Sequence, residues 1–254
     1  MLKVIFLGTG TSQGIPVISS TNSVCFSSDK KDKRLRVSIA VEWDDYRYII
    51  DCGPDFRYQM LRENINHIDG ILFTHEHADH SAGMDDIRPF SFRLGGVPIY
   101  ASQRVIENFS KRFDYIFDNK NKYPGAPSVH INEIDNKPFQ LKNIKVIPVE
   151  VNHADVPVLG YRFNDFAYLT DVKTISVTEK NKLKGLKVLV LNALREKPHF
   201  SHLNIQEALE LIDELKPEKT YLTHISVDMG FHEDAQKKLP KNVFLAYDGL
   251  QLSI

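Results

Sequence analysis

One short run of residues constrains this chain more than any other part of its sequence. Within six positions it places three histidines and one aspartate, namely His75, His77, Asp79 and His80. The run directly follows the apolar segment 71–73, which predicts a short buried strand, and loops that leave such strands commonly carry chemistry. In an extended stretch, side chains two residues apart point the same way, so His75 and His77 can bind one ion. A turn after them would direct Asp79 and His80 to a neighbouring point.

The donor types in this run indicate which metals it suits. Imidazole and carboxylate are borderline to hard donors, and the run offers no thiolate, so zinc, manganese or iron fits best. A surface loop can collect histidines by chance, but the preceding strand makes that interpretation the weaker one. Glu76 lies between two of the histidines, and we expect it to be structural or to face solvent.

Hydrophobic periodicity predicts strands in two groups that look alike in kind, followed by a mixed tail. The expected strands cover 2–7, 35–43, 46–50, 71–73, 144–151, 158–163, 166–169, 188–191, 220–223 and 243–246. Asp44-Asp45 is expected to join two of them as a hairpin. Helices are expected over 102–113, 204–215 and 233–239, with Asn204 as N-cap and Glu207 completing a capping box in the second. The segment 114–127 is expected to be a flap or long loop.

Length and composition bound the class of protein. The chain has 254 residues, which α/β folds often reach in one domain, so we expect a single domain over 1–254. No apolar run approaches the roughly 20 residues that a membrane span requires, and we find no secretion signal. Two cysteines and a formal net charge of -1 favour a cytoplasmic protein without a global attraction to nucleic acid.

The histidine run also matches a family signature. It follows the His-x-His-x-Asp-His pattern of the metallo-β-lactamase superfamily, and three later segments match the other metal motifs of that superfamily in order: Val151-Asn152-His153, Tyr168-Leu169-Thr170-Asp171 and Tyr221-Leu222-Thr223-His224. The resemblance implies an α/β fold of the αββα type, in which two β-sheets carry helices on their outer faces.

The same resemblance implies a ligand set for two divalent metal ions, zinc or manganese. One ion would be bound by His75, His77 and His153, and the second by Asp79, His80 and His224, with Asp171 bridging the two. A bridging carboxylate offsets the repulsion between two close cations, and a hydroxide held between them would be the nucleophile. Asp79 is expected to orient that hydroxide as well.

Two further segments resemble particular branches of the superfamily. The opening Phe6-Leu7-Gly8-Thr9-Gly10-Thr11-Ser12-Gln13-Gly14-Ile15-Pro16 looks like that of transfer-RNA 3′-end endonucleases and of the cyclic ribosyl-phosphate phosphodiesterases of phosphonate breakdown. The segment 199–204 resembles the second of these branches, in which a histidine just before a helix is the general acid, and this role falls on His202. A role for His199 stays open. We expect His67, His130 and His232 to be structural.

One departure from the phosphonate-pathway enzymes concerns their extra structural zinc. Those enzymes bind it with a cluster of cysteines near the N-terminus and with a histidine after the last metal motif. Here the early region keeps only Cys25, and the later position is Val227. We therefore expect no structural zinc.

These patterns predict a metal-dependent phosphodiesterase that acts on a small or cyclic phosphodiester. A transfer-RNA 3′-end processing endonuclease is disfavoured because no long basic arm is visible, and a thioester hydrolase leaves His202 without a task. A β-lactamase is less favoured still, and a non-catalytic metal-binding sensor remains the alternative outside enzymes. The expected partner is a small molecule rather than nucleic acid or a membrane, and a homodimer stays open.

Overall fold

Two mixed β-sheets form the centre of the computed structural model, which describes residues 1–118, 120 and 122–254. In spatial order, the first sheet comprises β14 (Gln251–Ser253), β1 (Leu2–Gly8), β2 (Ser38–Trp43), β3 (Tyr46–Ile50), β4 (Gly70–Leu72), β5 (Val97–Ala101) and β6 (Val129–Glu133). The second comprises β13 (Val243–Leu245), β12 (Lys219–Thr223), β11 (Val188–Asn192), β10 (Phe166–Leu169), β9 (Val156–Phe163), β8 (Ile144–His153) and β7 (Phe139–Leu141).

The two sheets repeat one pattern of strand direction. In the first sheet, pairs from β14 to β3 are antiparallel and pairs from β3 to β6 are parallel. In the second, pairs from β7 to β10 are antiparallel and pairs from β10 to β13 are parallel. The similarity of the two halves is therefore confirmed at the level of topology, as is the hairpin, in which Trp43 pairs with Tyr46.

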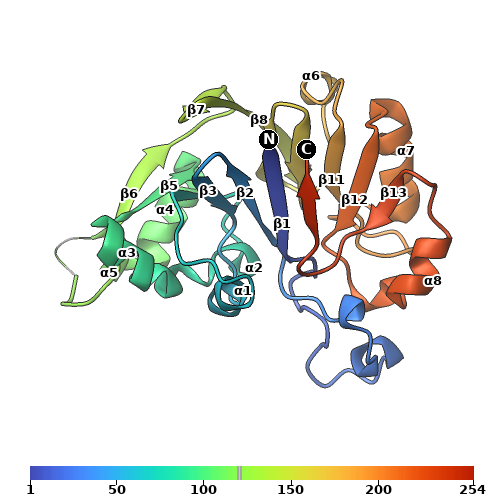
Figure 1. Cartoon of the computed structure of the whole chain (residues 1–254), viewed down its shortest axis with the longest axis horizontal. Helices are drawn as coiled ribbons and strands as arrows, with labels where there is room; N and C mark the ends of the chain where they lie inside the picture. The colour runs from blue at the N-terminus through green and yellow to red at the C-terminus, as the bar shows by residue number, and fades with distance from the viewer. Residues whose placement is uncertain (119, 121) are drawn as a thin grey trace.

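Helices cover the outer face of each sheet. They are α1 (Phe56–Arg62), α2 (Ala78–Ser81), α3 (Arg88–Leu94), α4 (Gln103–Arg112), α5 (Asp114–Phe117), α6 (Val177–Asn181), α7 (Ile205–Leu215) and α8 (His232–Lys237), with short 3-10 turns at Ser23–Phe26, Lys30–Asp32, Met84–Ile87 and Val227–Met229. Figure 1 shows α3 and α4 beside the first sheet, and α7 and α8 beside the second. The expected αββα arrangement is confirmed.

Three apolar clusters account for these layers. One lies between the sheets and joins side chains of both, such as Phe6 and Ile39 from the first and Tyr161 and Phe166 from the second. A second cluster packs the second sheet against α7 and α8, and a third packs the first sheet against α1, α3 and α4. Because each sheet buries both faces, several strands read as continuous apolar runs rather than as alternating ones.

The helices predicted over 102–113 and 204–215 are confirmed as α4 and α7, whereas the prediction for 114–127 needs correction. Asn204 caps α7, its side chain accepts from the Glu207 N–H, and the Glu207 carboxylate accepts from the Asn204 N–H. The expected flap over 114–127 instead begins with the short helix α5, because Ile116 is buried against the third cluster. Asn119 and Asn121 of this segment lie outside the described residues.

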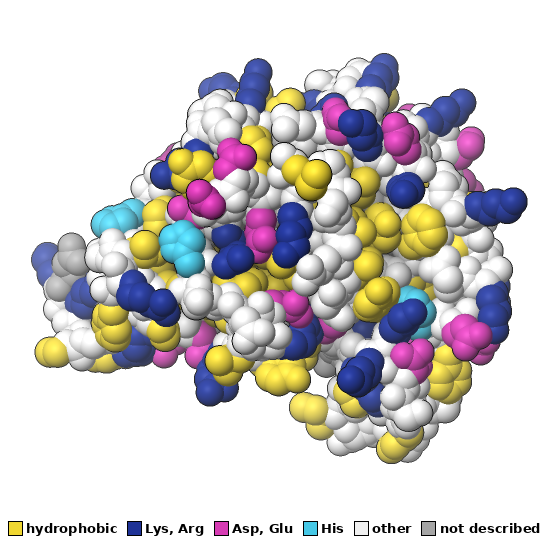
Figure 2. Space-filling model, in the orientation of Figure 1, with side chains coloured by type: hydrophobic (Ala, Val, Ile, Leu, Met, Phe, Trp, Pro, Cys, Tyr) yellow, Lys and Arg dark blue, Asp and Glu magenta, His cyan; other side chains and the backbone are white. Residues whose placement is uncertain are grey.

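The surface and the cysteines agree with the composition. Figure 2 shows acidic and basic side chains interspersed on the visible face, as expected for a chain with a formal net charge of -1. Cys25 and Cys52 are both free and buried. Within the described part of the chain, no helix is long and apolar enough to cross a membrane.

Candidate metal centre

The ends of several strands bring the predicted ligands to one edge of the sandwich. The histidine run follows β4, His153 is the last residue of β8, Asp171 follows β10 and His224 follows β12. The expected turn after His77 is the short helix α2, which His77 precedes as N-cap. Since carboxyl ends of parallel strands meet at the same edge of a sheet, residues as far apart in sequence as His75 and His224 become neighbours.

Asp171 lies at the centre of this cluster. Its Oδ2 is 2.9 Å from His80 Nε2 and 3.3 Å from His75 Nε2, and its Oδ1 is 2.9 Å from His224 Nε2. The carboxyl group therefore faces ligands assigned to both ions, which is the geometry that a bridging carboxylate needs. Asp79 completes the second set, since its Oδ2 is 3.3 Å from His80 Nε2 and 3.6 Å from His224 Nε2.

The donor atoms of the first ligand set, His75, His77 and His153, lie farther apart than those of the second set. The ring centroids of His75 and His77 are 4.6 Å apart, and those of His77 and His153 are 5.3 Å apart. Triads whose donor atoms all lie within 4.8 Å of one another include His75 with His80 and Asp171, and Asp79 with His80 and His224. All seven predicted ligands thus converge, although the closest triad around His75 uses His80 rather than His77.

His202 belongs to the same cluster. Its Nδ1 is 3.7 Å from Asp171 Oδ1, and its ring stacks on His224 at a centroid distance of 4.7 Å. His202, Asp171 and His224 also form a compact triad of donor atoms. The structure therefore places the candidate general acid beside the candidate bridging carboxylate.

Hydrogen bonds fix which nitrogen of each histidine faces the cluster. Asp51, which is fully buried, accepts from His80 Nδ1 at 2.7 Å and from the Thr74 hydroxyl at 2.8 Å. Because the Thr74 hydroxyl donates its proton to Asp51, the Thr74 oxygen accepts from His75 Nδ1 at 3.0 Å. His153 Nδ1 donates to the Ser201 carbonyl at 2.8 Å. The Nε2 lone pairs of these three rings are left for metal ions.

Asp51 holds the candidate ligand His80 in place, and the sequence did not single it out. It ends no recognisable motif in Asp51-Cys52-Gly53, and its backbone has a positive φ of 66°. Asp171 and His224 share this left-handed conformation, with φ of 59° and 58°. Such angles cost on the order of 1 kcal/mol each for residues other than glycine and concentrate at functional sites.

Unpaired nitrogen atoms show that this cluster fits metal ions. Nε2 of His75, His80 and His224 is buried and makes no well-directed hydrogen bond, and the same holds for His202 Nδ1. Buried polar atoms without partners are costly, so several of them at one site indicate that the site is built to bind a ligand. Divalent cations are the ligands that imidazole nitrogen and carboxylate oxygen bind together.

Comparison with known proteins identifies the family. The model of the Beta-lactamase superfamily domain matches residues 46–225, which includes every predicted ligand. The chain belongs to the metallo-β-lactamase superfamily. A diphosphatase from the PhnP family, whose crystal structure is known, is 41% identical in sequence to this superfamily member. The two structures superimpose with a TM-score of 0.93, and the match covers 100% of this chain and 98% of the diphosphatase chain.

Two further proteins resemble this chain. An octanoyltransferase from Porphyromonas gingivalis is 38% identical to this chain over 100% of its length. The chain spans only about half of that protein, 52% of its length. The Zn²⁺-bound PqqB from Methylobacterium extorquens shares the fold with a TM-score of 0.79 at 17% identity, over 99% of this chain and 100% of that chain.

Electrostatics in this superfamily site follow from burial and from the paired charges. Burial opposes ionisation of Asp171, but His224 and His80 hold its pKa well below its usual range. Burial likewise opposes a charge on His224, but Asp171 and Asp79 raise the pKa of His224 to about 9. Burial and then repulsion from His224 lower the pKa of His202 to about 3. These directions describe an ionised Asp171 beside a His224 ring that favours its charged form and a His202 ring that favours its neutral form.

The remaining histidines and Glu76 lie away from this superfamily site, as predicted, except for His199. The Glu76 carboxylate pairs with Arg104 at 2.7 Å, His67 pairs with Asp69, and His232 contacts Arg34. The ring of His130 packs against Gly96 on the first sheet. By contrast, the ring centroid of His199 lies 5.2 Å from that of His202.

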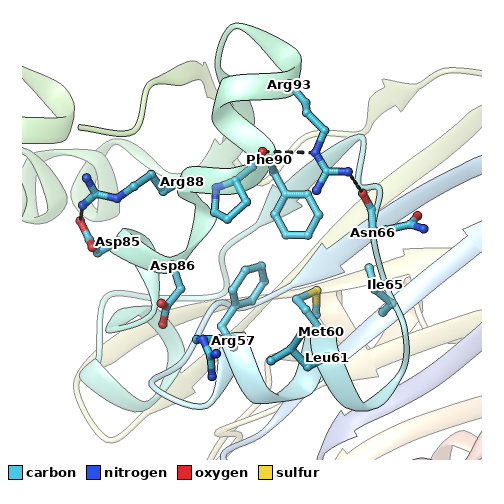
Figure 3. Close-up of a pocket in the computed structure, with 12 residues that line it drawn as sticks. Arg57, Met60, Leu61, Ile65, Asn66, Asp85, Asp86, Arg88, Phe90 and Arg93 are labelled. Atoms are coloured by element: carbon cyan, nitrogen blue, oxygen red, sulfur yellow. Dashed lines mark hydrogen bonds and ion pairs between the residues drawn. The ribbon is translucent and has the colours of Figure 1, made fainter. Parts of the chain in front are cut away.

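A separate cavity of about 440 Å³ lies between α1 and α3, on the outer side of the first sheet (Figure 3). Met60, Ile65 and Phe90 form its apolar wall, and Arg57 and Arg93 lie at its rim. None of the predicted site residues lines it, so we do not assign the superfamily chemistry to it.

Proposed function

We propose that the chain is a two-metal hydrolase of phosphoric esters, acting on a small phosphodiester or on a diphosphate. The observation that supports this most is the position of Asp171, whose two oxygens face histidines of both ligand sets. The named activity of the 41% identical relative, a diphosphatase, supports phosphorus rather than carbon as the centre attacked.

The chemistry divides between the ions and the chain. When bound here, two divalent ions would supply an activated water at neutral pH and neutralise charge that develops on a phosphoryl group. Asp171 would hold the two sites at a fixed separation. Asp79, whose side chain is less buried than Asp171, would orient the attacking water.

His202 would protonate the departing oxygen through Nδ1, the ring nitrogen nearest Asp171. Burial lowers the pKa of His202 to about 3, so the free site disfavours its charged form. A phosphoryl anion beside the ring would oppose this effect and favour the imidazolium. The N-terminus of α7, which begins three residues later, would attract the same anion.

A second candidate is hydrolysis of an acyl thioester. The specific observation in its favour is the 38% identity to a protein named as an octanoyltransferase. That name does not decide the function of this chain, because the chain spans about half of that protein. Nor does the thioester reaction require His202 as an acid, since a thiolate departs without protonation.

One assay separates these candidates. The metal-stripped protein would be reloaded separately with Mn²⁺ and Zn²⁺ and tested on bis(p-nitrophenyl) phosphate, on a diphosphate ester and on an octanoyl thioester. Turnover of a phosphate ester alone supports the proposal and names the active metal. Turnover of the thioester alone contradicts it.

A non-catalytic sensor would bind the metal without hydrolysing any of these esters, and His202→Ala tests the catalytic alternative. The proposal expects this variant to retain its bound metal and to lose ester hydrolysis by on the order of 10²- to 10⁴-fold, as expected for a general acid. Unchanged hydrolysis with unchanged metal content would remove His202 from the reaction.

A further inference from the structure

A largely exposed aromatic side chain lies close in sequence to the candidate general acid His202. Phe200 is 78% exposed, whereas the two residues that follow it, Ser201 and His202, are only 4% and 8% exposed. Exposing a phenyl ring forgoes roughly 2 kcal/mol of burial. A single exposed phenylalanine needs no explanation in general, so its surroundings decide whether it has a role.

The backbone around Phe200 is held firmly. The Ser201 carbonyl accepts from His153 Nδ1 at 2.8 Å, and the Leu203 N–H donates to the Val172 carbonyl at 2.8 Å. On the other side, Arg195 donates to the Pro198 carbonyl at 3.2 Å. The ring of Phe200 is therefore presented by a fixed segment and does not project from a loose end.

A row of rings leads from Phe200 to the candidate ligands. The ring centroids are 4.7 Å apart from Phe200 to His199, 5.2 Å from His199 to His202, and 4.7 Å from His202 to His224. The interplanar angles along the row are 34°, 35° and 27°. The row therefore runs from the exposed ring of Phe200 to the buried rings of His202 and His224 at the proposed site of phosphoryl chemistry.

His199 is fixed within this row. Its Nδ1 accepts from the Ser201 N–H at 3.3 Å, and burial, followed by repulsion from Arg195, lowers its pKa. A neutral imidazole is a better stacking surface for an aromatic ring than a hydrated cation. Two residues earlier, Lys197 is exposed and adds a positive charge to the same segment.

From this arrangement we propose that Phe200 and His199 form a stacking subsite for a nucleobase, so that the substrate is a nucleotide ester rather than a plain sugar phosphate. The inference rests on the proposed function, because it places the phosphoryl group at the metal centre and the base on the ring row. Base–aromatic stacking tolerates any base, since every base has a π-face. The subsite therefore selects nucleotides as a class.

Two ligands that differ only in the base test this subsite. Adenosine 5′-monophosphate and ribose 5-phosphate would each be titrated into the zinc-loaded protein by calorimetry, without turnover. The wild-type chain is expected to bind the nucleotide more tightly. Phe200→Ala should weaken the nucleotide roughly 5- to 100-fold and change the sugar phosphate less than about twofold, and Phe200→Trp should restore nucleotide binding.

Phe92→Ala is the matched control, because Phe92 is also exposed, at 62%, but lies on α3. It should leave both titrations unchanged. Equal affinity of the wild-type chain for the two ligands, or equal weakening of both by Phe200→Ala, would overturn the subsite. This outcome differs from failure of the proposed function, which is absence of ester hydrolysis and leaves the titrations interpretable.

Discussion

At the scale of single residues, Asp51 is the group on which the order of the metal centre most depends. It holds His80 directly and His75 through the Thr74 hydroxyl, so one carboxylate orients histidines of both ligand sets. An amide in its place keeps the shape but loses the negative charge and half of the acceptor capacity. The prediction from sequence missed this residue because no pattern of neighbours distinguishes it from an ordinary turn aspartate.

Asp51→Asn is therefore expected to lower zinc affinity by about 10- to 100-fold. Competition with a chromophoric chelator measures this affinity. Asp69→Asn is the matched control, because Asp69 also pairs with a histidine, His67, but outside the site. Zinc affinity of Asp51→Asn equal to that of the wild-type chain would contradict the orienting role.

His232 gives a prediction about acid stability. Its Nδ1 accepts from Arg34 at 3.1 Å, and burial, followed by repulsion from Arg34, lowers its pKa to about 4. Between its unfolded value of about 6.5 and this folded value, the unfolded chain binds a proton that the folded chain does not. Stability contributed by the neutral ring is therefore present above about pH 6.5 and is lost as the pH falls toward 4, by about 3 kcal/mol in total.

In His232→Asn, an amide oxygen can replace Nδ1 as the acceptor without a titratable proton. Urea unfolding of both proteins at several pH values is the measurement. The wild-type free energy of unfolding should fall more steeply between pH 6.5 and 4 than that of the variant. Parallel pH profiles would show that His232 does not titrate in this way.

At the scale of elements, α4 supports the ligand run from outside. Arg112 donates to the Glu76 carbonyl at 2.7 Å and to the Ser81 hydroxyl at 3.1 Å, and that hydroxyl donates to the His77 carbonyl at 2.8 Å. The helix was predicted from its apolar spacing, but the spacing says nothing about which backbone its polar face would reach.

Arg112→Met should consequently destabilise the fold by about 1–3 kcal/mol and weaken zinc binding, because the Glu76 carbonyl and the Ser81 hydroxyl lose a charged donor. The free energy of unfolding in urea and a chelator competition report the two effects. Arg104→Met removes the nearby ion pair between the Arg104 and Glu76 side chains. Because the Arg104 side chain is half-exposed, this loss should cost less than about 1 kcal/mol. Equal effects of the two substitutions would contradict a special role for Arg112.

The start of α7 links helix stability to the candidate acid. Asn204 caps this helix two residues after His202, so its loss should cost about 1 kcal/mol and lower the melting temperature by about 2–4 °C. Asn204→Ala, compared with Gln206→Ala on the exposed side of the first turn, is the test by thermal unfolding. A melting temperature that both variants share with the wild-type chain would show that the cap contributes nothing.

At the scale of the whole molecule, the parts that the sequence predicted are those with strong local signals. The ligands were predictable because each of their motifs follows or ends a strand and the motifs occur in a fixed order. By contrast, β6 was missed because Val129–Glu133 is a polar, largely exposed strand beside β5, and α1 was missed because seven residues give too few apolar positions to establish a period. Pairing partners and tertiary packing, rather than local preference, decide such elements.

The metal content of the chain tests the central claim most directly. The protein would be stripped with a chelator, reloaded with excess Zn²⁺, dialysed and analysed by mass spectrometry for ions per chain, with Asp171→Ala treated in parallel. The account predicts about two ions per chain for the wild-type protein and fewer for the variant, because Asp171 faces both ligand sets. A wild-type chain that retains no ion, or a variant that retains as many as the wild-type chain, would contradict it.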